Sequence, residues 1–297
     1  MHDCVIIGGG PAGLTAAIYM ARFLRPAILL SSGRPRLDHI PRSRNLPGFP
    51  DGIAGGEFLE RLLEQASLYG IAPRDERVER ITREGAAFTI VTATGTLQSR
   101  TVILATGVTN HRPAMSDAAH EDALSRGLIR YCPICDAFEV RGQRIAVYGG
   151  DDHALAEARF LRRYARDVWL TVPREPDDAP PDTALRARAE AAGVGLLEVV
   201  PGIADSSGET IALQLRGGGR KSFDTLYSAL GTTAHSGLAR GLGAALTAAG
   251  CIKVDAQNRT SVEGLYAIGD VIDGVDQIAF ALGHAAVATT AIHNALS

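Results

Sequence analysis

Residues 5–13 read Val-Ile-Ile-Gly-Gly-Gly-Pro-Ala-Gly, an apolar run that ends in a glycine-rich turn. This turn fits the pattern G-x-G-x-x-G. Apolar residues then recur with helical spacing from Leu14 to Phe23, and a second apolar run covers residues 27–30. The order strand, glycine turn, helix, strand predicts a βαβ unit that binds a dinucleotide. A glycine turn without a ligand is the alternative.

Each glycine of the pattern has its own physical role. Gly8 permits the tight turn, Gly10 lets the backbone approach a pyrophosphate, and Gly13 lets the helix pack on the strand. Pro11 and Ala12 lie within this turn, and the helix that follows attracts phosphate through its free N–H groups and its dipole. We therefore expect these residues to bind the pyrophosphate of a dinucleotide.

The end of the second apolar run departs from the usual pattern. An acidic residue is expected there, about 20 positions after the glycines, to bind a ribose hydroxyl. Ser31 and Ser32 are the candidates in this chain. A serine hydroxyl hydrogen-bonds a ribose more weakly than a carboxylate does. Ser31 and Ser32 are thus predicted cofactor-binding residues, with reduced affinity for the adenosine part.

Two further segments repeat the strand and glycine pattern. Residues 145–148 form an apolar run before Gly149 and Gly150, and a helical pattern follows from Ala154 to Tyr164. This second βαβ unit starts about 140 residues after the first, so two nucleotide-binding-like domains are expected. Near the end of the chain, an apolar run at 265–268 precedes a long helical pattern from Ala279 to Leu296. The sequence predicts an α/β fold of two Rossmann-like, three-layer domains.

Composition limits the classes of function. The chain has 297 residues, a net charge of −3 and 46% hydrophobic residues. Near-neutral charge gives no reason to expect nucleic-acid binding. No stretch reaches the roughly 18 apolar residues of a membrane helix. The early Asp3 and the direct run into glycines do not fit a signal peptide, so we expect a cytoplasmic protein.

The segment Tyr131-Cys132-Pro133-Ile134-Cys135-Asp136 contains the reactive chemistry. Thiols at C-x-x-C spacing can close a disulfide, and such motifs often have lowered thiol pKa values. Asp136 follows the second cysteine and could move protons during thiol exchange. We therefore predict Cys132, Cys135 and Asp136 as catalytic residues.

Other interpretations of the cysteines are weaker. A zinc site needs four ligands, and the sequence has no second C-x-x-C or histidine cluster, so no metal is expected. A structural disulfide does not suit a reducing compartment. Cys4 lies in an apolar run and is expected to be a small apolar filler, as is Cys251.

Together these pieces resemble the low-molecular-weight thioredoxin reductase family over nearly the whole chain. The motifs that carry the resemblance are, in order, GGGPAG at 8–13, Asn45–Phe49, Ala105–Gly107, CPICD at 132–136, and Gly269-Asp270 followed by Asp276–Ile278. The resemblance implies FAD as cofactor. It also implies an FAD domain at 1–111 and 237–297, with the C-x-x-C domain inserted at 112–236.

By the same resemblance, the cofactor-binding set extends well beyond the glycine turn. Asp270 would bond the ribityl–phosphate region, and the N-terminus of the last helix would stabilise a reduced, anionic flavin. The residues implied outside the first βαβ unit are Asn45, Ala105, Thr106, Gly107, Gly269, Asp270, Gln277 and Ile278.

The family also implies how the cysteines work. Cys135 would exchange electrons with the flavin, Cys132 would react with the partner disulfide, and Asp136 would be the acid or base. The expected partner is a thioredoxin-like protein or a small disulfide. Members are homodimers, and their inserted domain rotates between the two half-reactions.

The chain departs from the family where NADPH should bind. Asp151 stands in the second fingerprint where the family has glycine, and its carboxylate would repel phosphate. After the next strand the family has a basic run, whereas here Arg174 is followed by Glu175, Asp177 and Asp178. We therefore expect that NADPH is not the efficient donor, although NADH or NADPH binding through other contacts stays open.

Several functions remain in competition. The leading one is an FAD-dependent reductase of thioredoxin-like proteins, fed by a ferredoxin-type or unknown donor. Arginines 34, 36, 42 and 44 could meet an acidic protein donor, although such runs are more often a solvated face. A dithiol oxidase that uses oxygen, an ordinary NADPH-dependent thioredoxin reductase and a non-enzymatic flavin redox sensor are the alternatives.

Overall fold

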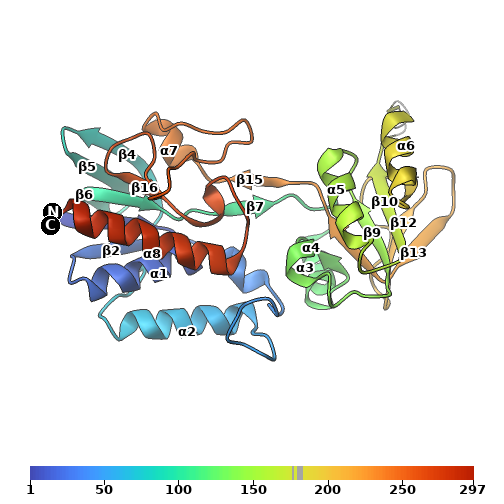
Figure 1. Cartoon of the computed structure of the whole chain (residues 1–297), viewed down its shortest axis with the longest axis horizontal. Helices are drawn as coiled ribbons and strands as arrows, with labels where there is room; N and C mark the ends of the chain where they lie inside the picture. Colours follow the sequence, from blue (N-terminus) through green and yellow to red (C-terminus); the bar gives the residue numbers. More distant parts are fainter. Residues whose placement is uncertain (176, 179–182) are drawn as a thin grey trace. The chain divides into compact units, whose positions relative to one another are not determined.

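The computed structural model describes residues 1–175, 177–178 and 183–297. The chain divides into two compact units. Unit 1 comprises residues 1–42, 46–109 and 233–297, and unit 2 comprises 110–232 together with 43–45 (Figure 1). The boundaries expected from sequence, 111/112 and 236/237, lie two and four residues after those of the structure, 109/110 and 232/233. The short segment 43–45 was not expected to group with the inserted unit.

Unit 1 is built on a sheet with the strand order β3-β2-β1-β6-β5-β4, in which β16 also pairs with β6. β1, β2, β3 and β16 run parallel to their neighbours, whereas β4, β5 and the first half of β6 form an antiparallel meander. The strands are β1 His2–Ile7, β2 Ala27–Ser31, β3 Arg74–Asp75, β4 Val78–Glu84, β5 Ala87–Thr92, β6 Gly95–Leu104 and β16 Leu265–Ala267.

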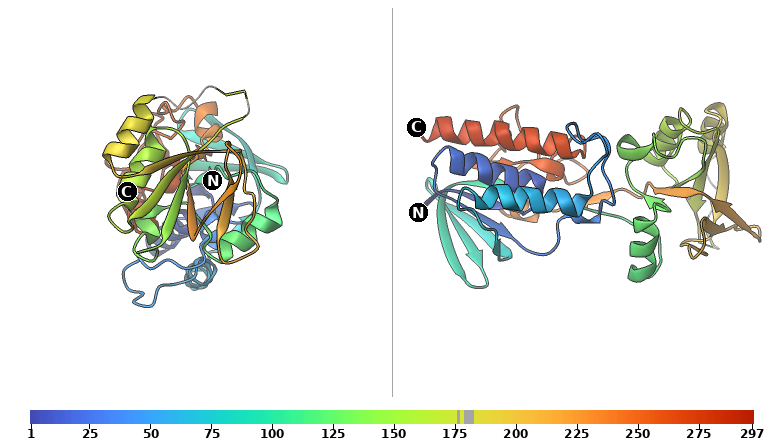
Figure 2. Two further views of the ribbon diagram at one scale, coloured as in Figure 1. Left: turned by 90° about the vertical axis from the view of Figure 1, so that its right-hand side faces the viewer. Right: turned by 90° about the horizontal axis from the view of Figure 1, so that it is seen from below.

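Three long helices of unit 1 lie side by side along one face of this sheet (Figure 2, right). They are α1 Pro11–Arg22, α2 Gly55–Ser67 and α8 Ile278–Ala295. The opposite face packs against the segment that contains α7 (Gly237–Gly241) and Ile252. Two short 3-10 helices, η1 (Arg36–His39) and η2 (Gly269–Val271), complete the unit.

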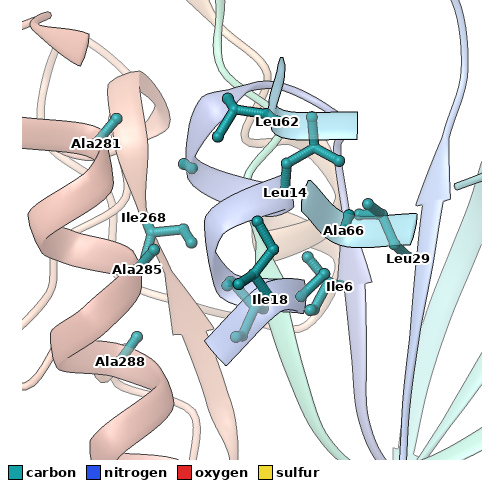
Figure 3. Packing of buried hydrophobic residues seen from close by; sticks show 14 of the residues in the cluster. Ile6, Leu14, Ile18, Leu29, Leu62, Ala66, Ile268, Ala281, Ala285 and Ala288 are labelled. Carbon is teal, nitrogen blue, oxygen red and sulfur yellow. The ribbon is translucent and has the colours of Figure 1, made fainter. Parts of the chain in front are cut away.

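The core beneath the three helices explains their order. Leu14 and Ile18 of α1 are buried together with Ala281, Ala285 and Ala288 of α8 (Figure 3). Because alanine side chains are short, α8 can lie close to α1 along this row. α1 is therefore the middle helix of this layer and packs against both α2 and α8.

Unit 2 contains a five-stranded, fully parallel sheet with the order β11-β10-β9-β14-β8. Its strands are β8 Ile129–Arg130, β9 Arg144–Tyr148, β10 Asp167–Pro173, β11 Gly195–Val199 and β14 Thr225–Ser228. The hairpin of β12 (Ile211–Gln214) and β13 (Arg220–Phe223) forms a separate two-stranded sheet, and β7 (Val108–Asn110) pairs with β15 (Thr232–Ala234).

Alternating residues of the unit 2 strands face two separate cores. Ile145, Val147 and Tyr227 join the core on the side of α4 (Pro133–Asp136), α5 (Asp152–Leu161) and α6 (Thr183–Ala191). Ala146 and Leu226 join the core on the side of α3 (Asp117–Ser125) and the hairpin. The two nucleotide-binding-like folds expected from the repeated βαβ pattern are confirmed.

The helices begin earlier than their apolar spacing predicts. The expected starts at Leu14 and Ala154 become Pro11 and Asp152. First turns are selected by proline and capping residues, which an apolar pattern does not detect. The buried position predicted for Cys4 is confirmed, and burial raises the pKa of its thiol to about 12. The same prediction for Cys251 is wrong, because Cys251 is only partly buried.

Within residues 1–175, 177–178 and 183–297, no helix combines the length and apolar character needed to cross a bilayer. The same residues contain no group of three or more His, Cys, Asp or Glu side chains that could hold a metal ion.

Candidate active site

The predicted cofactor residues of unit 1 meet where its parallel strands end. Hydrogen bonds join the strand ends directly, from Gly8 N–H to Leu30 O at 2.8 Å and from Ala105 N–H to Ile7 O at 2.8 Å. Ligands of open α/β sheets bind outside the carboxyl ends of the strands. The fold thus brings the glycine turn, the end of β2 and the end of β6 to one edge.

The glycine turn has the geometry of a dinucleotide cradle. Gly8 has φ +117°, a value that favours glycine, and a side chain there would overlap the Ala105 carbonyl. A side chain on Gly13 would overlap the Gly8 carbonyl, so α1 can approach the turn only with glycine there. At Gly10, the N-cap of α1, a side chain would meet no atom within 4 Å in the described part of the chain. Gly10 therefore leaves the N–H groups of the first turn, including that of Ala12, accessible to a pyrophosphate.

Of the two predicted serines, Ser31 ends β2 and lies beside this turn. Ser31 is half-buried, and its Oγ lies so close to Gly9 that a side chain on Gly9 would overlap it. Ser32 is exposed. Ser31 is therefore the better placed of the two to contact an adenosine ribose.

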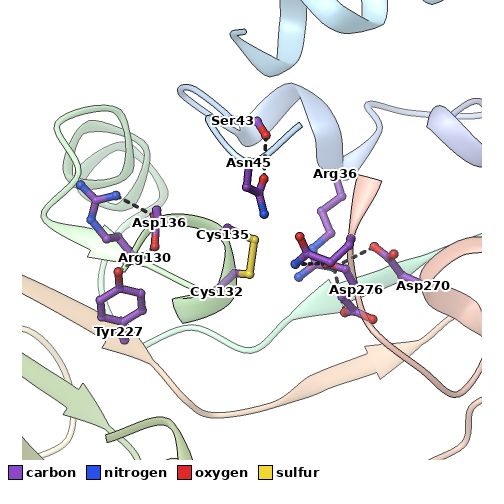
Figure 4. Close-up of a disulfide and its surroundings, with 11 residues drawn as sticks. Arg36, Ser43, Asn45, Arg130, Cys132, Cys135, Asp136, Tyr227, Asp270 and Asp276 are labelled. Atoms are coloured by element: carbon purple, nitrogen blue, oxygen red, sulfur yellow. Dashed lines mark hydrogen bonds and ion pairs between the residues drawn. A yellow bond between two sulfur atoms is a disulfide. The ribbon is translucent and has the colours of Figure 1, made fainter. Parts of the chain in front are cut away.

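Asp270 lies in an ionic cluster that the sequence did not predict. It sits in η2 directly after Gly269, which has φ +72° and lies against Ala12 at the start of α1. Arg36 Nη1 donates to Asp270 Oδ2 at 2.8 Å and to Asp276 Oδ2 at 3.0 Å (Figure 4). Burial and the Asp270 charge raise the pKa of Asp276, and Arg36 opposes this shift.

This cluster changes the interpretation of the arginines at positions 34, 36 and 42. Arg36 is an internal partner of two carboxylates rather than part of a solvated face. Arg34 pairs with Asp38, and Arg42 donates to the Asp51 and Gly52 carbonyls. Arg36 is therefore the one of these three that is least accessible to a partner protein, whereas the Arg34 side chain stays exposed. Distant charge pairs such as Arg36 and Asp270 leave no local signal.

The remaining predicted cofactor residues of unit 1 fall into two places. Thr106 Oγ1 donates to His235 O at 2.8 Å, and Gly107 adopts φ +66° next to it. Gln277 is the N-cap of α8 and Ile278 its first residue. The Gln277 side chain donates to Asp276 O at 3.0 Å instead of covering the helix end. The N-terminus of this 18-residue helix therefore has no side-chain cap, and its dipole favours an anion.

In unit 2, Cys132 and Cys135 form a disulfide (Figure 4). Cys132 is the N-cap of the short helix α4, and Pro133 is its first residue, where the missing N–H costs nothing. Cys135 N–H donates to Cys132 O at 3.0 Å, which closes the turn and brings the two sulfurs together. The pair predicted from the C-x-x-C spacing is confirmed as a disulfide.

Asp136 is anchored on both of its carboxylate oxygens. Arg130 Nη1 donates to Oδ2 at 2.6 Å, and Tyr227 OH donates to Oδ1 at 2.7 Å. The sequence predicted Asp136 but neither of its partners. Asn45, the remaining predicted residue, accepts a hydrogen bond from Ser43 Oγ at 3.1 Å within the 43–45 segment.

The second glycine turn differs from the first at the helix start. Asp151 occupies the N-cap of α5, the position that Gly10 has in α1. Asp151 Oδ1 accepts the N–H of Ala154 at 2.9 Å. An open cavity of about 450 Å³ adjoins it, lined by Gly150, Asp151, Asp152, His153, Arg174, Leu185 and Arg188. The helix end that would hold a phosphate already holds a carboxylate of the protein.

Glu157 lies in α5, six residues after Asp151, and its pKa is perturbed. Burial, and secondarily the Asp151 charge, raise the pKa of Glu157 to about 7. His153 Nε2 lies 3.2 Å from Glu157 Oε1. A raised folded-state pKa contributes stability below the unfolded pKa that is lost as pH rises through about 7.

We therefore expect the free energy of unfolding of unit 2 to fall by about 2 kcal/mol between pH 5 and pH 8. The variant Glu157→Gln should show little of this fall. Trp169, the only tryptophan of the chain, lies in β10 and reports the unfolding of unit 2 by fluorescence during urea titration. An equal pH dependence of the free energy of unfolding in the wild type and the variant would contradict a raised pKa of Glu157.

A dinucleotide cradle in one unit and an exchangeable disulfide followed by an anchored carboxylate in the other define a flavin-type disulfide oxidoreductase. The comparisons agree. The family model described as pyridine nucleotide-disulphide oxidoreductase matches residues 2–290, and the chain belongs to this family.

The relatives narrow the class to enzymes of the thioredoxin reductase type. The thioredoxin reductase of Mycolicibacterium smegmatis is 34% identical over 92% of this chain and 89% of its own length. The thioredoxin reductase of Streptomyces coelicolor is 31% identical over 92% of this chain and 87% of its own length. The solved thioredoxin reductase of Streptococcus pyogenes superposes with a TM-score of 0.87 at 28% identity, covering 100% of this chain and 98% of that one. The chain is accordingly a thioredoxin reductase-like, FAD-dependent disulfide oxidoreductase.

Proposed function

We propose that this protein reduces the disulfide of a thioredoxin-like protein, using electrons that bound FAD passes to the Cys132–Cys135 disulfide. The observation that carries the proposal is that disulfide, which is followed directly by the anchored carboxylate of Asp136. FAD supplies a two-electron store when bound, and Gly8, Gly10, Gly13 and Ser31 would hold it. The names of the relatives supply the partner class.

The exchange proceeds in three steps. Two electrons and two protons convert the Cys132–Cys135 disulfide to two thiols. The Cys132 thiolate attacks the partner disulfide, forming a mixed disulfide and releasing one partner thiol. Cys135 then attacks Cys132 Sγ, which restores the enzyme disulfide and releases the second partner thiol. Asp136 moves protons in these steps.

We further propose that NADPH is not the efficient electron donor. The support is the contrast between the two helix starts, since α1 begins with Gly10 and open space whereas α5 begins with Asp151. The Asp151 carboxylate takes the N–H of Ala154 and adds negative charge where pyrophosphate would lie. A protein donor of the ferredoxin type, or another donor, would then reduce the flavin.

The donor proposal is tested by mixing the flavin-loaded protein with NADPH, and separately with NADH, in the absence of oxygen. The proposal expects slow or no bleaching of the flavin at micromolar nucleotide, with full bleaching by dithionite. Rapid bleaching by NADPH would overturn it and identify an ordinary NADPH-dependent thioredoxin reductase.

A single substitution should partly restore NADPH use. The variant Asp151→Gly removes the carboxylate from the start of α5, and we expect flavin reduction by NADPH to accelerate about tenfold or more. Asp152→Asn is the matched control, because Asp152 is the neighbouring acid and its carboxylate pairs with Arg188 at 2.7 Å. Equal rates in the Asp151 variant and the wild type would show that the carboxylate does not limit nucleotide binding.

The dithiol oxidase alternative uses the same residues in reverse, from substrate thiols through the cysteines to flavin and oxygen. Its relatives often carry histidine after the second cysteine, whereas this chain has Asp136. Rapid oxygen consumption with a dithiol would favour it. The homodimer and the cytoplasmic location stay predictions from the sequence.

A further inference from the structure

Two carboxylates of unit 1 share one guanidinium nitrogen. Arg36 Nη1 lies 2.8 Å from Asp270 Oδ2 and 3.0 Å from Asp276 Oδ2 (Figure 4). The side chains of Arg36, Asp270 and Asp276 are 29%, 24% and 34% exposed, so water screens their charges only in part. Because both oxygens lie within 3.0 Å of one atom, the two carboxylates would repel each other if that atom were removed.

The cluster adjoins the start of α1, where the glycine turn would hold a pyrophosphate. Gly269 directly precedes Asp270, and a side chain on Gly269 would lie 3.0 Å from Ala12 Cβ. Ala12 is the second residue of α1. Asp276 precedes Gln277, the N-cap of α8, whose first turn has no side-chain cap. The two carboxylates therefore lie beside two helix starts that favour an anion.

Arg36 reaches this cluster from an anchored turn. It begins η1, whose next residue, Leu37, is 3% exposed and belongs to the same core as Ala12. A side chain on Gly55 would overlap the Leu37 carbonyl, so the start of α2 packs directly on η1. Gly55 N–H also donates to Ile40 O at 2.9 Å. The position of Arg36 is thus set by the fold and not by the ion pairs alone.

The charges at this end of the sheet need a balance when a dinucleotide binds. A pyrophosphate brings negative charge to the glycine turn, and two carboxylates beside it would weaken binding in a partly buried site. Among residues 1–175, 177–178 and 183–297, Arg36 is the only cation that forms an ion pair with Asp270 or Asp276. The repulsion on a bound pyrophosphate is therefore set by whether Arg36 is present.

We propose that Arg36 is a positioning residue for FAD, which holds Asp270 and Asp276 and cancels the repulsion that they would exert on the pyrophosphate. This inference rests on the proposed use of FAD and is independent of the electron donor and of the partner disulfide. It gives a cofactor role to an arginine that the sequence alone suggested as a contact for an acidic protein.

The test is fluorescence titration of the flavin-free full chain with FAD. In Arg36→Gln we expect the dissociation constant for FAD to rise about tenfold or more, because two carboxylates then lie beside the pyrophosphate without a counter-charge. Arg36→Lys should stay within about threefold of the wild type, since one nitrogen makes both contacts and an ammonium group can replace it.

A second substitution separates charge balance from a direct contact between Arg36 and the cofactor. Added to Arg36→Gln, the change Asp276→Asn removes one of the two unbalanced charges, and we expect the dissociation constant to return to within about threefold of the wild type. Asp276→Asn alone should change it by less than about threefold. If Arg36 bound the phosphates itself, the second change would leave the loss of affinity in place.

A matched control addresses the general loss of an ion pair in unit 1. Arg83 pairs with Glu263 at 2.8 Å, and its side chain is 29% exposed, as is that of Arg36. Arg83→Gln should leave FAD affinity unchanged within about twofold. If flavin-free Arg36→Gln does not fold, as judged by urea unfolding, the double variant is compared with Asp276→Asn, and their affinities should agree within about threefold.

Equal FAD affinity in the wild type and Arg36→Gln would overturn the inference. So would a double variant that binds FAD about tenfold more weakly than Asp276→Asn does, since it would show that Arg36 acts without these carboxylates. A wild type that binds no FAD would instead overturn the proposed cofactor, and the inference with it, so the two failures are distinguishable.

Discussion

Replacing Cys132 with serine is expected to reduce thioredoxin turnover on the order of 1,000-fold or more, because the nucleophile that attacks the partner disulfide is lost. Flavin binding should be unchanged, since the glycine turn and the other predicted cofactor residues except Asn45 lie in unit 1, whereas Cys132 lies in unit 2. The measurement is the reduction of oxidised thioredoxin by the flavin-loaded protein, with dithionite-reduced flavin as the electron source.

Two further variants sharpen this result. Cys135→Ser should trap a mixed disulfide between Cys132 and thioredoxin, because nothing remains to resolve it, and Cys132→Ser should trap none. Cys251→Ser is the matched control, as this partly buried cysteine lies outside the disulfide, and it should keep at least half of the activity. Substantial turnover in Cys132→Ser would contradict the assigned roles.

The second large effect is expected at the glycine turn. The variant Gly10→Asp would place a carboxylate at the N-cap of α1, reproducing the arrangement that Asp151 has at α5. We expect FAD affinity to fall about 100-fold or more, because the carboxylate would compete for the N–H groups and repel the pyrophosphate. Fluorescence titration of the apoprotein with FAD measures this change.

The fold should tolerate the substitution, which separates binding from stability. Aspartate is a favourable N-cap and Gly10 has φ −78°, so the free energy of unfolding should be equal or higher by about 1 kcal/mol. Gly10→Ala is the matched control, since it adds a methyl group without charge. An Asp variant that binds FAD as tightly as the Ala variant would show that charge at this helix start does not govern binding.

The parts of the site that depend on local sequence were predictable. A glycine that needs φ +117°, a helix that must approach a carbonyl at Gly13, and two cysteines one helical turn apart each leave a signature within a few residues. The local sequence also identifies Asp151 as an acidic residue where the family has glycine. The structure adds that its carboxylate already caps α5.

The parts that depend on strand order were not predictable. Arg130 and Tyr227 are 97 positions apart and meet only because β8 is the edge neighbour of β14. Arg36 meets Asp270 across 234 positions, since η1 and η2 come from opposite ends of the chain. A periodic apolar pattern predicts that strands exist but not which strands are neighbours, so these charge networks had no signal in a single sequence.

The central claim is that flavin, the Cys132–Cys135 pair and a partner disulfide exchange electrons, whatever the physiological donor. It is tested most directly by reducing the flavin-loaded protein with one equivalent of dithionite without oxygen, then adding oxidised bacterial thioredoxin. The account predicts that flavin absorbance returns at its visible maximum while thioredoxin gains two thiols per flavin, and that Cys132→Ser shows neither change. Flavin that stays reduced in the wild type after thioredoxin is added would contradict the account.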